Sequence, residues 1–185
     1  MQNYDDKIWN LDGEKLLAIG GEHSDILVFG DYIQKNLAFM KYKNGYGLST
    51  DDTAQFIRSQ LAEAIRKGPY SVNCLLAGFE GEQPRLYWID YLGSVIETSK
   101  AAHGYAEYLV SSVMDTLQTN DLTEEEGLKI IDKCLNSMRD RFVISQSSFS
   151  IKVVRKDGIR VVREAAKPQG AFWLLHCTIL PNTTI

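Results

Sequence analysis

Histidine and cysteine are the side chains that most often ligate metals or act as nucleophiles, and this chain has three of each. A metal site needs several such ligands at short spacing, but only His176 and Cys177 are adjacent, and adjacent side chains rarely bind one ion. No Gly-x-Ser-x-Gly nucleophile elbow is present. The residue patterns therefore predict no metal centre and no cofactor, and they identify no enzyme class. The residues considered are His23, His103, His176, Cys74, Cys134 and Cys177.

Two other patterns have a chemical interpretation and a structural one. Glu124, Glu125 and Glu126 could serve as acid–base groups, but their place in the first turn of a predicted helix favours a solvated, dipole-stabilised face. Gly45-Tyr46-Gly47 begins a glycine pattern without a third glycine in phase or a strand before it. It indicates a helix–helix turn and not a dinucleotide-binding loop. Cys74 in an apolar strand and Cys134 on a helix stripe are expected to be inert core thiols.

Length and composition limit the remaining classes. The chain has 185 residues, 20 Lys and Arg, 24 Asp and Glu, and a net charge of −4, which suits one globular domain. Mild acidity gives no electrostatic footprint for nucleic acid. The run 171–180 is too short to cross a bilayer, which takes roughly 20 apolar residues. An odd number of widely spaced cysteines and no secretory signal at Met1–Lys7 indicate a reduced intracellular compartment.

Hydrophobic periodicity predicts an alternation of strand pairs and helix pairs. Asp12-Gly13 and Lys156-Asp157-Gly158 are hairpin turn signals, Gly68-Pro69 ends a helix, and Thr123 to Glu126 is a capping box. The predicted strands are 8–9, 15–19, 72–79, 85–96, 149–154 and 159–163. The first predicted helix runs from about 24 to 43, the second opens at 49 or 50, the third follows His103-Gly104, and the fourth begins at 123.

This order is not the alternation of a doubly wound parallel sheet. Helices in consecutive pairs predict an α+β fold in which helix layers pack on antiparallel sheets. The strand from Val72 to Ala77 is apolar on nearly every residue, so it should be covered on both faces. Two stacked sheets with a helix pair on each outer face would satisfy both observations.

Several segments together resemble proteasome β-type subunits. They occur in family order and cover roughly residues 5 to 170. The resemblance implies a four-layer αββα sandwich of the N-terminal nucleophile hydrolase type. The segments are Asp31 to Asn36, Asn44-Gly45-Tyr46 with Leu48-Ser49, Val72 to Gly78, Ile89 to Leu92, Ala101 to Tyr105 and Lys133-Cys134-Leu135.

The resemblance also implies site positions. In catalytic members an N-terminal threonine attacks the peptide carbonyl with its own amine as base, a buried lysine assists, and a glycine amide forms the oxyanion hole. Lys7 falls at the lysine position and Gly21 at the oxyanion glycine. His103 stands where active members have a serine. At the position of the family's supporting aspartate this chain has Phe142, and at the position of that aspartate's partner, a serine, it has Ser145. Lys7, Gly21 and Ser145 are therefore interpreted as vestigial positions.

Active precursors are cut between glycine and threonine, and no threonine here follows a glycine. The resemblance thus predicts a non-catalytic structural subunit of the proteasome core particle, within the inner β ring that serves ubiquitin- and ATP-dependent degradation. Its partners would be other α- and β-type subunits in stacked heptameric rings, in the cytoplasm and nucleus. The alternatives are a threonine-type endopeptidase subunit and a truncated isoform unable to assemble.

The two ends of the chain depart from the family pattern. Only six residues precede Lys7, where the resemblance implies two further strands. Residues 1–170 are therefore expected to form a β-type subunit domain that lacks its first two strands. Residues 171–185 are expected to be an unmatched apolar tail.

Overall fold

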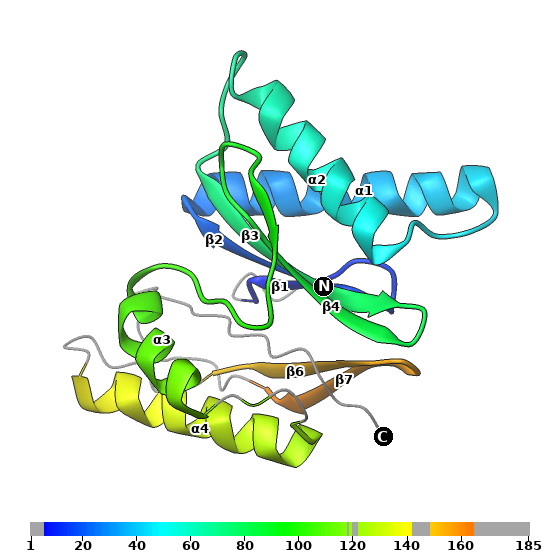
Figure 1. The fold of residues 1–185 in the computed structure, drawn as a ribbon. Helices are drawn as coiled ribbons and strands as arrows, with labels where there is room; N and C mark the ends of the chain where they lie inside the picture. Colours follow the sequence, from blue (N-terminus) through cyan, green and yellow to red (C-terminus); the bar gives the residue numbers. More distant parts are fainter. Residues whose placement is uncertain (1–5, 118, 120–121, 142–148, 165–185) are drawn as a thin grey trace.

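A computed structural model describes residues 6–117, 119, 122–141 and 149–164. Seven strands and four helices follow one another in the described residues (Figure 1). They are β1 (Ile8–Asn10), β2 (Leu16–Gly21), α1 (His23–Asn44), α2 (Thr50–Ala64), β3 (Val72–Glu80), β4 (Gln83–Ile89), β5 (Val95–Glu97), α3 (Tyr105–Leu117), α4 (Glu124–Arg141), β6 (Ile151–Arg155) and β7 (Gly158–Arg163).

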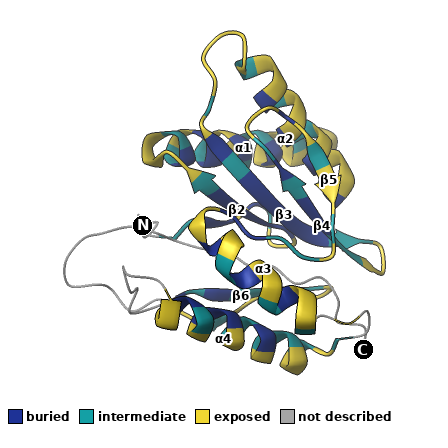
Figure 2. Cartoon of the chain, turned by 60° about the vertical axis from the view of Figure 1, so that its left-hand side comes forward, coloured by how far each residue is buried: buried dark blue, intermediate teal, exposed yellow. Residues whose placement is uncertain are grey.

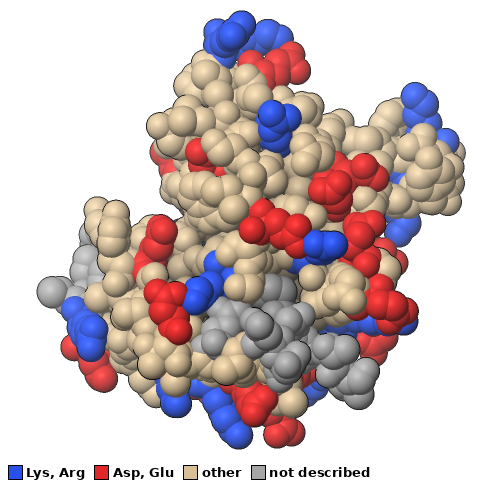
Figure 3. Space-filling view, in the orientation of Figure 1, with Lys and Arg blue, Asp and Glu red and all other residues tan. Residues whose placement is uncertain are grey.

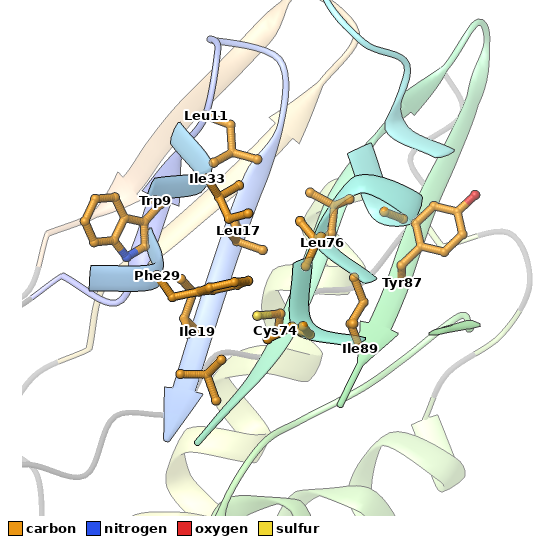
Figure 4. Close-up of a cluster of buried hydrophobic side chains, with 14 of the residues drawn as sticks. Trp9, Leu11, Leu17, Ile19, Phe29, Ile33, Cys74, Leu76, Tyr87 and Ile89 are labelled. Carbon is orange, nitrogen blue, oxygen red and sulfur yellow. The ribbon is translucent and has the colours of Figure 1, made fainter. Parts of the chain in front are cut away.

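The first sheet has five strands in the order β1-β2-β3-β4-β5, all paired antiparallel. Helices α1 and α2 cover one face of it (Figure 1). Side chains from both helices and from alternate strand positions form the largest buried cluster, which includes Leu17, Phe29, Ile57, Cys74 and Ile89 (Figure 4). Alternation is expected because successive side chains of a strand point to opposite faces.

A second sheet, β6 paired with β7, faces the other side of the first sheet. The cluster between the sheets contains Leu16, Leu75 and Leu86, with Val154 and Ile159 packed against it. Helices α3 and α4 cover the outer face of β6 and β7, with Val110 and Cys134 in a third cluster. The predicted order of helix, sheet, sheet and helix layers is confirmed.

Strands β2 and β3 are the most deeply buried part of the fold, as the dark blue strands of Figure 2 show. Leu16 and Leu17 point to opposite faces, yet both are at most 2% exposed, and Leu75 and Leu76 are fully buried. The prediction that the strand beginning at Val72 is covered on both faces is confirmed.

The predicted helix starts lie within one residue of the observed ones, as does the predicted end of the first helix. Ser49 caps α2, because its Oγ accepts a hydrogen bond from Asp52 N at 3.0 Å. The capping box before α4 is also present. Glu126 Oε2 accepts from Thr123 N at 2.9 Å, while Thr123 Oγ1 accepts from Glu126 N at 3.3 Å.

One predicted strand is wrong in its extent. The chain from Arg85 to Ile96 is not a single strand but β4 and β5, joined by a tight turn. Asp90 Oδ1 accepts hydrogen bonds from Leu92 N at 3.0 Å and from Ser94 N at 2.7 Å, which closes the turn. Strand β4 also begins earlier than predicted, because Pro84 pairs with Phe79 and only residues 81–82 remain in the turn before it.

Some predictions lie outside the described residues. These are the positions of Phe142 and Ser145 and the proposed tail at 171–185. The boundary between a domain at 1–170 and that tail stays a prediction for the same reason. Within the described residues, no helix is long and apolar enough to span a membrane. On the face shown in Figure 3, both signs of charge are present, and acidic side chains are more frequent around the middle right of the view.

Gly30 in the middle of α1 lets the helix approach the edge strand β1. A Cβ atom at this position would lie 2.4 Å from Cε2 and 2.6 Å from Cζ2 of Trp9, far inside van der Waals contact. Trp9 is itself only 6% exposed, so its indole has little room to move away. The absent side chain of Gly30 is therefore what admits the Trp9 ring beneath α1.

Replacing Gly30 by alanine should destabilise the chain even though alanine favours helix. The helix-propensity gain is about 1 kcal/mol, whereas overpacking a filled core costs about 1–3 kcal/mol. Urea denaturation should show the net loss. Gly68→Ala, at a position outside the helices, controls for the loss of a glycine without a clash, since nothing lies within 4 Å of a Cβ there.

The clash with the indole can be tested separately. Trp9→Phe removes the atoms that the new Cβ would meet, so Gly30→Ala should cost less in that background than in the natural chain. Equal losses in both backgrounds would show that the close approach of Trp9 is not the cause.

Candidate functional site

The end of β2 is built from two glycines that pair with β3, Gly20 with Asn73 and Gly21 with Val72. Gly21 has a φ of 144°, a conformation that side chains rarely adopt. A Cβ there would lie 2.0 Å from the carbonyl oxygen of Ser71 and 2.9 Å from Val72 Cα. Only glycine fits at position 21, because the obstacle is the neighbouring backbone.

His103 lies against the first of these glycines. Its Cβ, Cγ and Cδ2 are 3.4 to 3.8 Å from where a Cβ of Gly20 would be, and the residue is only 6% exposed. The loop that carries it is fixed at both ends. Thr98 N donates to Leu86 O of β4 at 2.9 Å, and Ala102 is buried in the cluster beneath α3 and α4. The imidazole therefore occupies the space beside the Gly20-Gly21 turn.

Lys7 directly precedes β1, the strand that pairs with β2. Its carbonyl oxygen accepts a hydrogen bond from Ile19 N at 3.0 Å. Lys7 therefore lies opposite Ile19, the residue just before Gly20. The side chain is half-buried, and this loss of solvent lowers the pKa of its ammonium below the usual 10.5.

The structure thus brings three of the predicted site positions to the same part of the fold. The backbone of Lys7 is hydrogen-bonded to Ile19, and His103 packs on Gly20. Gly21 is the next residue of the chain after Gly20. Ser145 and Phe142, the other two, lie outside the described residues, so their placement stays a prediction.

The thiols near this region are not suited to nucleophilic chemistry. Cys74 pairs with Ile19 across β2 and β3 and is completely buried, and burial raises the pKa of its thiol. Burial also raises the pKa of Cys134 to about 11. A nucleophilic cysteine needs a lowered pKa, so both described thiols have the properties expected of core residues.

A metal centre finds no support in the part of the chain that the structure describes. Within residues 6–117, 119, 122–141 and 149–164, no three His, Cys, Asp or Glu side chains gather closely enough to hold an ion. Glu124 is engaged by Arg155, which lowers the pKa of its carboxyl group through a hydrogen bond. It lies at the start of α4, as the structural interpretation of the glutamate run predicts.

The sequence prediction missed one buried lysine, Lys15, and one half-buried lysine, Lys152. Lys15 is 3% exposed, and its Nζ lies 2.5 Å from Asp12 Oδ2 in the β1–β2 turn. Lys152 is on β6, and its ammonium pairs with Asp6. The signal in both cases is a lysine inside or next to an apolar strand, Lys15 before Leu16-Leu17 and Lys152 between Ile151 and Val153.

Gly21→Ala should destabilise the fold whether or not the amide of Gly21 has any catalytic role. The cost should reach about 2–4 kcal/mol, from an unfavourable φ and a backbone clash together. Gly13→Ala is the matched control, because Gly13 also has a positive φ, 94°, but nothing lies within 4 Å of a Cβ there. Chemical denaturation of the two variants should separate them; equal losses would contradict the clash.

Comparison with known proteins gives the family. Residues 1–154 match the family described as "Proteasome subunit". The chain is 44% identical over 160 residues to "Proteasome subunit beta type-2-B" of Arabidopsis thaliana, covering 86% of this chain and 80% of that protein.

Two other relatives show that the similarity extends across distant organisms. Identity to "Proteasome subunit beta type-2" of Oryza sativa subsp. japonica is 42% over 157 residues, which cover 84% of this chain and 74% of the rice protein. Identity to "Proteasome subunit beta type-4" of Saccharomyces cerevisiae is 36% over 165 residues, which cover 88% and 84% of the two chains. The chain therefore belongs to the proteasome subunit family, and its similarity is to β-type subunits.

Proposed function

We propose that this chain is a non-catalytic structural subunit of the proteasome core particle. It would occupy the inner β ring and help to wall the chamber in which neighbouring subunits cleave ubiquitin-tagged substrates in an ATP-dependent pathway. Its partners would be other α- and β-type subunits in stacked heptameric rings. We place it in the cytoplasm and nucleus.

Membership of the family supports the assembly role, since the relatives are named as proteasome β-type subunits. A subunit of a closed particle needs a rigid body with a defined outer surface. The four packed layers, with three buried clusters between them, provide one.

The packing of His103 on Gly20 is the observation that carries the non-catalytic assignment. The resemblance implies a serine at position 103 in active members. Here the position holds a buried histidine that packs on Gly20. A buried histidine packed beside Gly20, in place of that serine, supports the proposal that this chain does not carry out the hydrolysis.

One further observation agrees with this assignment. Gly21 is required by packing against Ser71, which explains a glycine at this position without reference to catalysis.

Covalent labelling tests the assignment. Core particles purified through an affinity tag on this chain are treated with a threonine-directed epoxyketone or vinyl sulfone probe and examined by mass spectrometry. The catalytic subunits of the same particles should be labelled, which is the internal control. This chain should carry no label. A probe adduct on it would contradict the non-catalytic assignment.

A further inference from the structure

Lys152 lies on the face of β6 that points toward the first sheet. Side chains two residues apart share one face of a strand, and Val154 packs against the cluster between the sheets. Ile151 and Arg155 point the other way, Ile151 into the core under α3 and α4 and Arg155 onto Glu124 of α4. A lysine between two sheets is unfavourable unless its ammonium is paired.

The partners of Lys152 are found in the segment that leads into β1. The side chain is 11% exposed, and its Nζ forms an ion pair with Asp6. It also donates a hydrogen bond to the carbonyl oxygen of Ile8 at 2.7 Å. The other carboxylate oxygen of Asp6 accepts from Ile8 N at 3.0 Å. One ammonium and one carboxylate therefore hold both the N–H and the C=O of Ile8.

The pairing between β6 and β7 is irregular at this residue. Ile151 pairs with Arg163 and Lys152 with Val161, so the ladder skips Val162, which packs into the α3–α4 cluster. Such bulges change the direction in which nearby side chains point. The irregularity lies at Lys152, the residue whose ammonium contacts Asp6 and Ile8.

The apolar contact between the sheets is uneven. In the described part of the chain, its buried members all come from β1 to β4, while β6 and β7 contribute Val154 and Ile159, which are only partly buried. Each half of the sandwich has a separate core with its own helix pair. Each half is therefore stabilised mainly by its own apolar core. The contact between the β6–β7 hairpin and the first sheet depends more on polar interactions.

A second ion pair on the same hairpin provides a natural comparison. Lys156 in the β6–β7 turn pairs with Glu82 in the β3–β4 turn. Their side chains are 63% and 75% exposed, so solvent screens the pair and it should contribute little. Lys152 differs because its ammonium is largely removed from water.

We propose that Lys152 is a latch between the two halves of the sandwich. It ties the segment Asp6–Ile8 to β6, and releasing it makes transient openings of the β6–β7 hairpin away from the first sheet more frequent, while each half keeps its own helix-backed core. The latch is a conformational device of this chain and does not depend on whether the chain is catalytic.

Hydrogen exchange of the full 185-residue chain, read by mass spectrometry, tests the latch. Lys152→Met keeps the length of the side chain and removes its charge. Exchange should accelerate on the order of tenfold in residues 6–10 and 151–155, the two segments that the latch joins. Exchange in α1, α2 and α4 should be unchanged. Lys152→Arg should restore most of the protection, and Lys156→Met should behave as the natural chain.

Asp6→Asn approaches the same contact from the other partner and keeps the experiment informative if Lys152→Met does not fold. It should open the same segments, and adding it to Lys152→Met should have little further effect. The proposal is overturned if exchange in those segments stays at the natural rate in both variants. It is also overturned if acceleration is uniform over all elements, or if Lys156→Met opens the same segments as strongly.

Discussion

The rest of the structure depends on the burial of β2 and β3 on both faces. Two side chains face the helices α1 and α2, namely Leu17 and Leu76, and two face the second sheet, namely Leu16 and Leu75. All four are at most 2% exposed. Burying each such side chain contributes about 1.5–3 kcal/mol, so leaving either face of these strands open would cost much of the stability of a domain. One face is covered by α1 and α2, and the other by the second sheet with its own helix pair.

This constraint also explains the residues at the candidate site. Because β2 must pair with β3 up to its last residue, the backbone of Gly21 comes so close to Ser71 that a side chain is excluded. The loop that returns from β5 to α3 passes the same end of β2 and buries His103 on Gly20. A group of residues that the family resemblance associates with catalysis is thus maintained here by packing. Its presence alone is no argument for hydrolysis.

Much of the fold could be predicted from the sequence because its signals are local. The helix stripes, the Ser49 and Thr123 caps and the Asp12-Gly13 hairpin depend on neighbouring residues, and the structure agrees with them. The break between β4 and β5 was missed because the residues around it remain largely apolar. A Cβ atom on Gly93 in that turn would lie 3.0 Å from the carbonyl oxygen of Arg58 and 3.2 Å from the backbone nitrogen of Ala62, both in α2. That contact joins residues far apart in the sequence.

The site was predictable only through the family resemblance. No local pattern marks Lys7, Gly21 and His103 as neighbours, since β2 and the loop before α3 meet through strand pairing. The partners of Lys15 and Lys152 could not be predicted for the same reason. A lysine in an apolar strand signals a buried charge, but its partner, such as Asp6 for Lys152, can be 146 residues away.

Assembly of this chain into core particles tests the account most directly. Particles isolated through a tag on the chain are weighed intact by native mass spectrometry and then dissociated into subunits. The proposal predicts a particle of four stacked rings in which this chain takes one β position per inner ring. Recovery of the tagged chain only as a free monomer, with no other proteasome subunit bound, would contradict it.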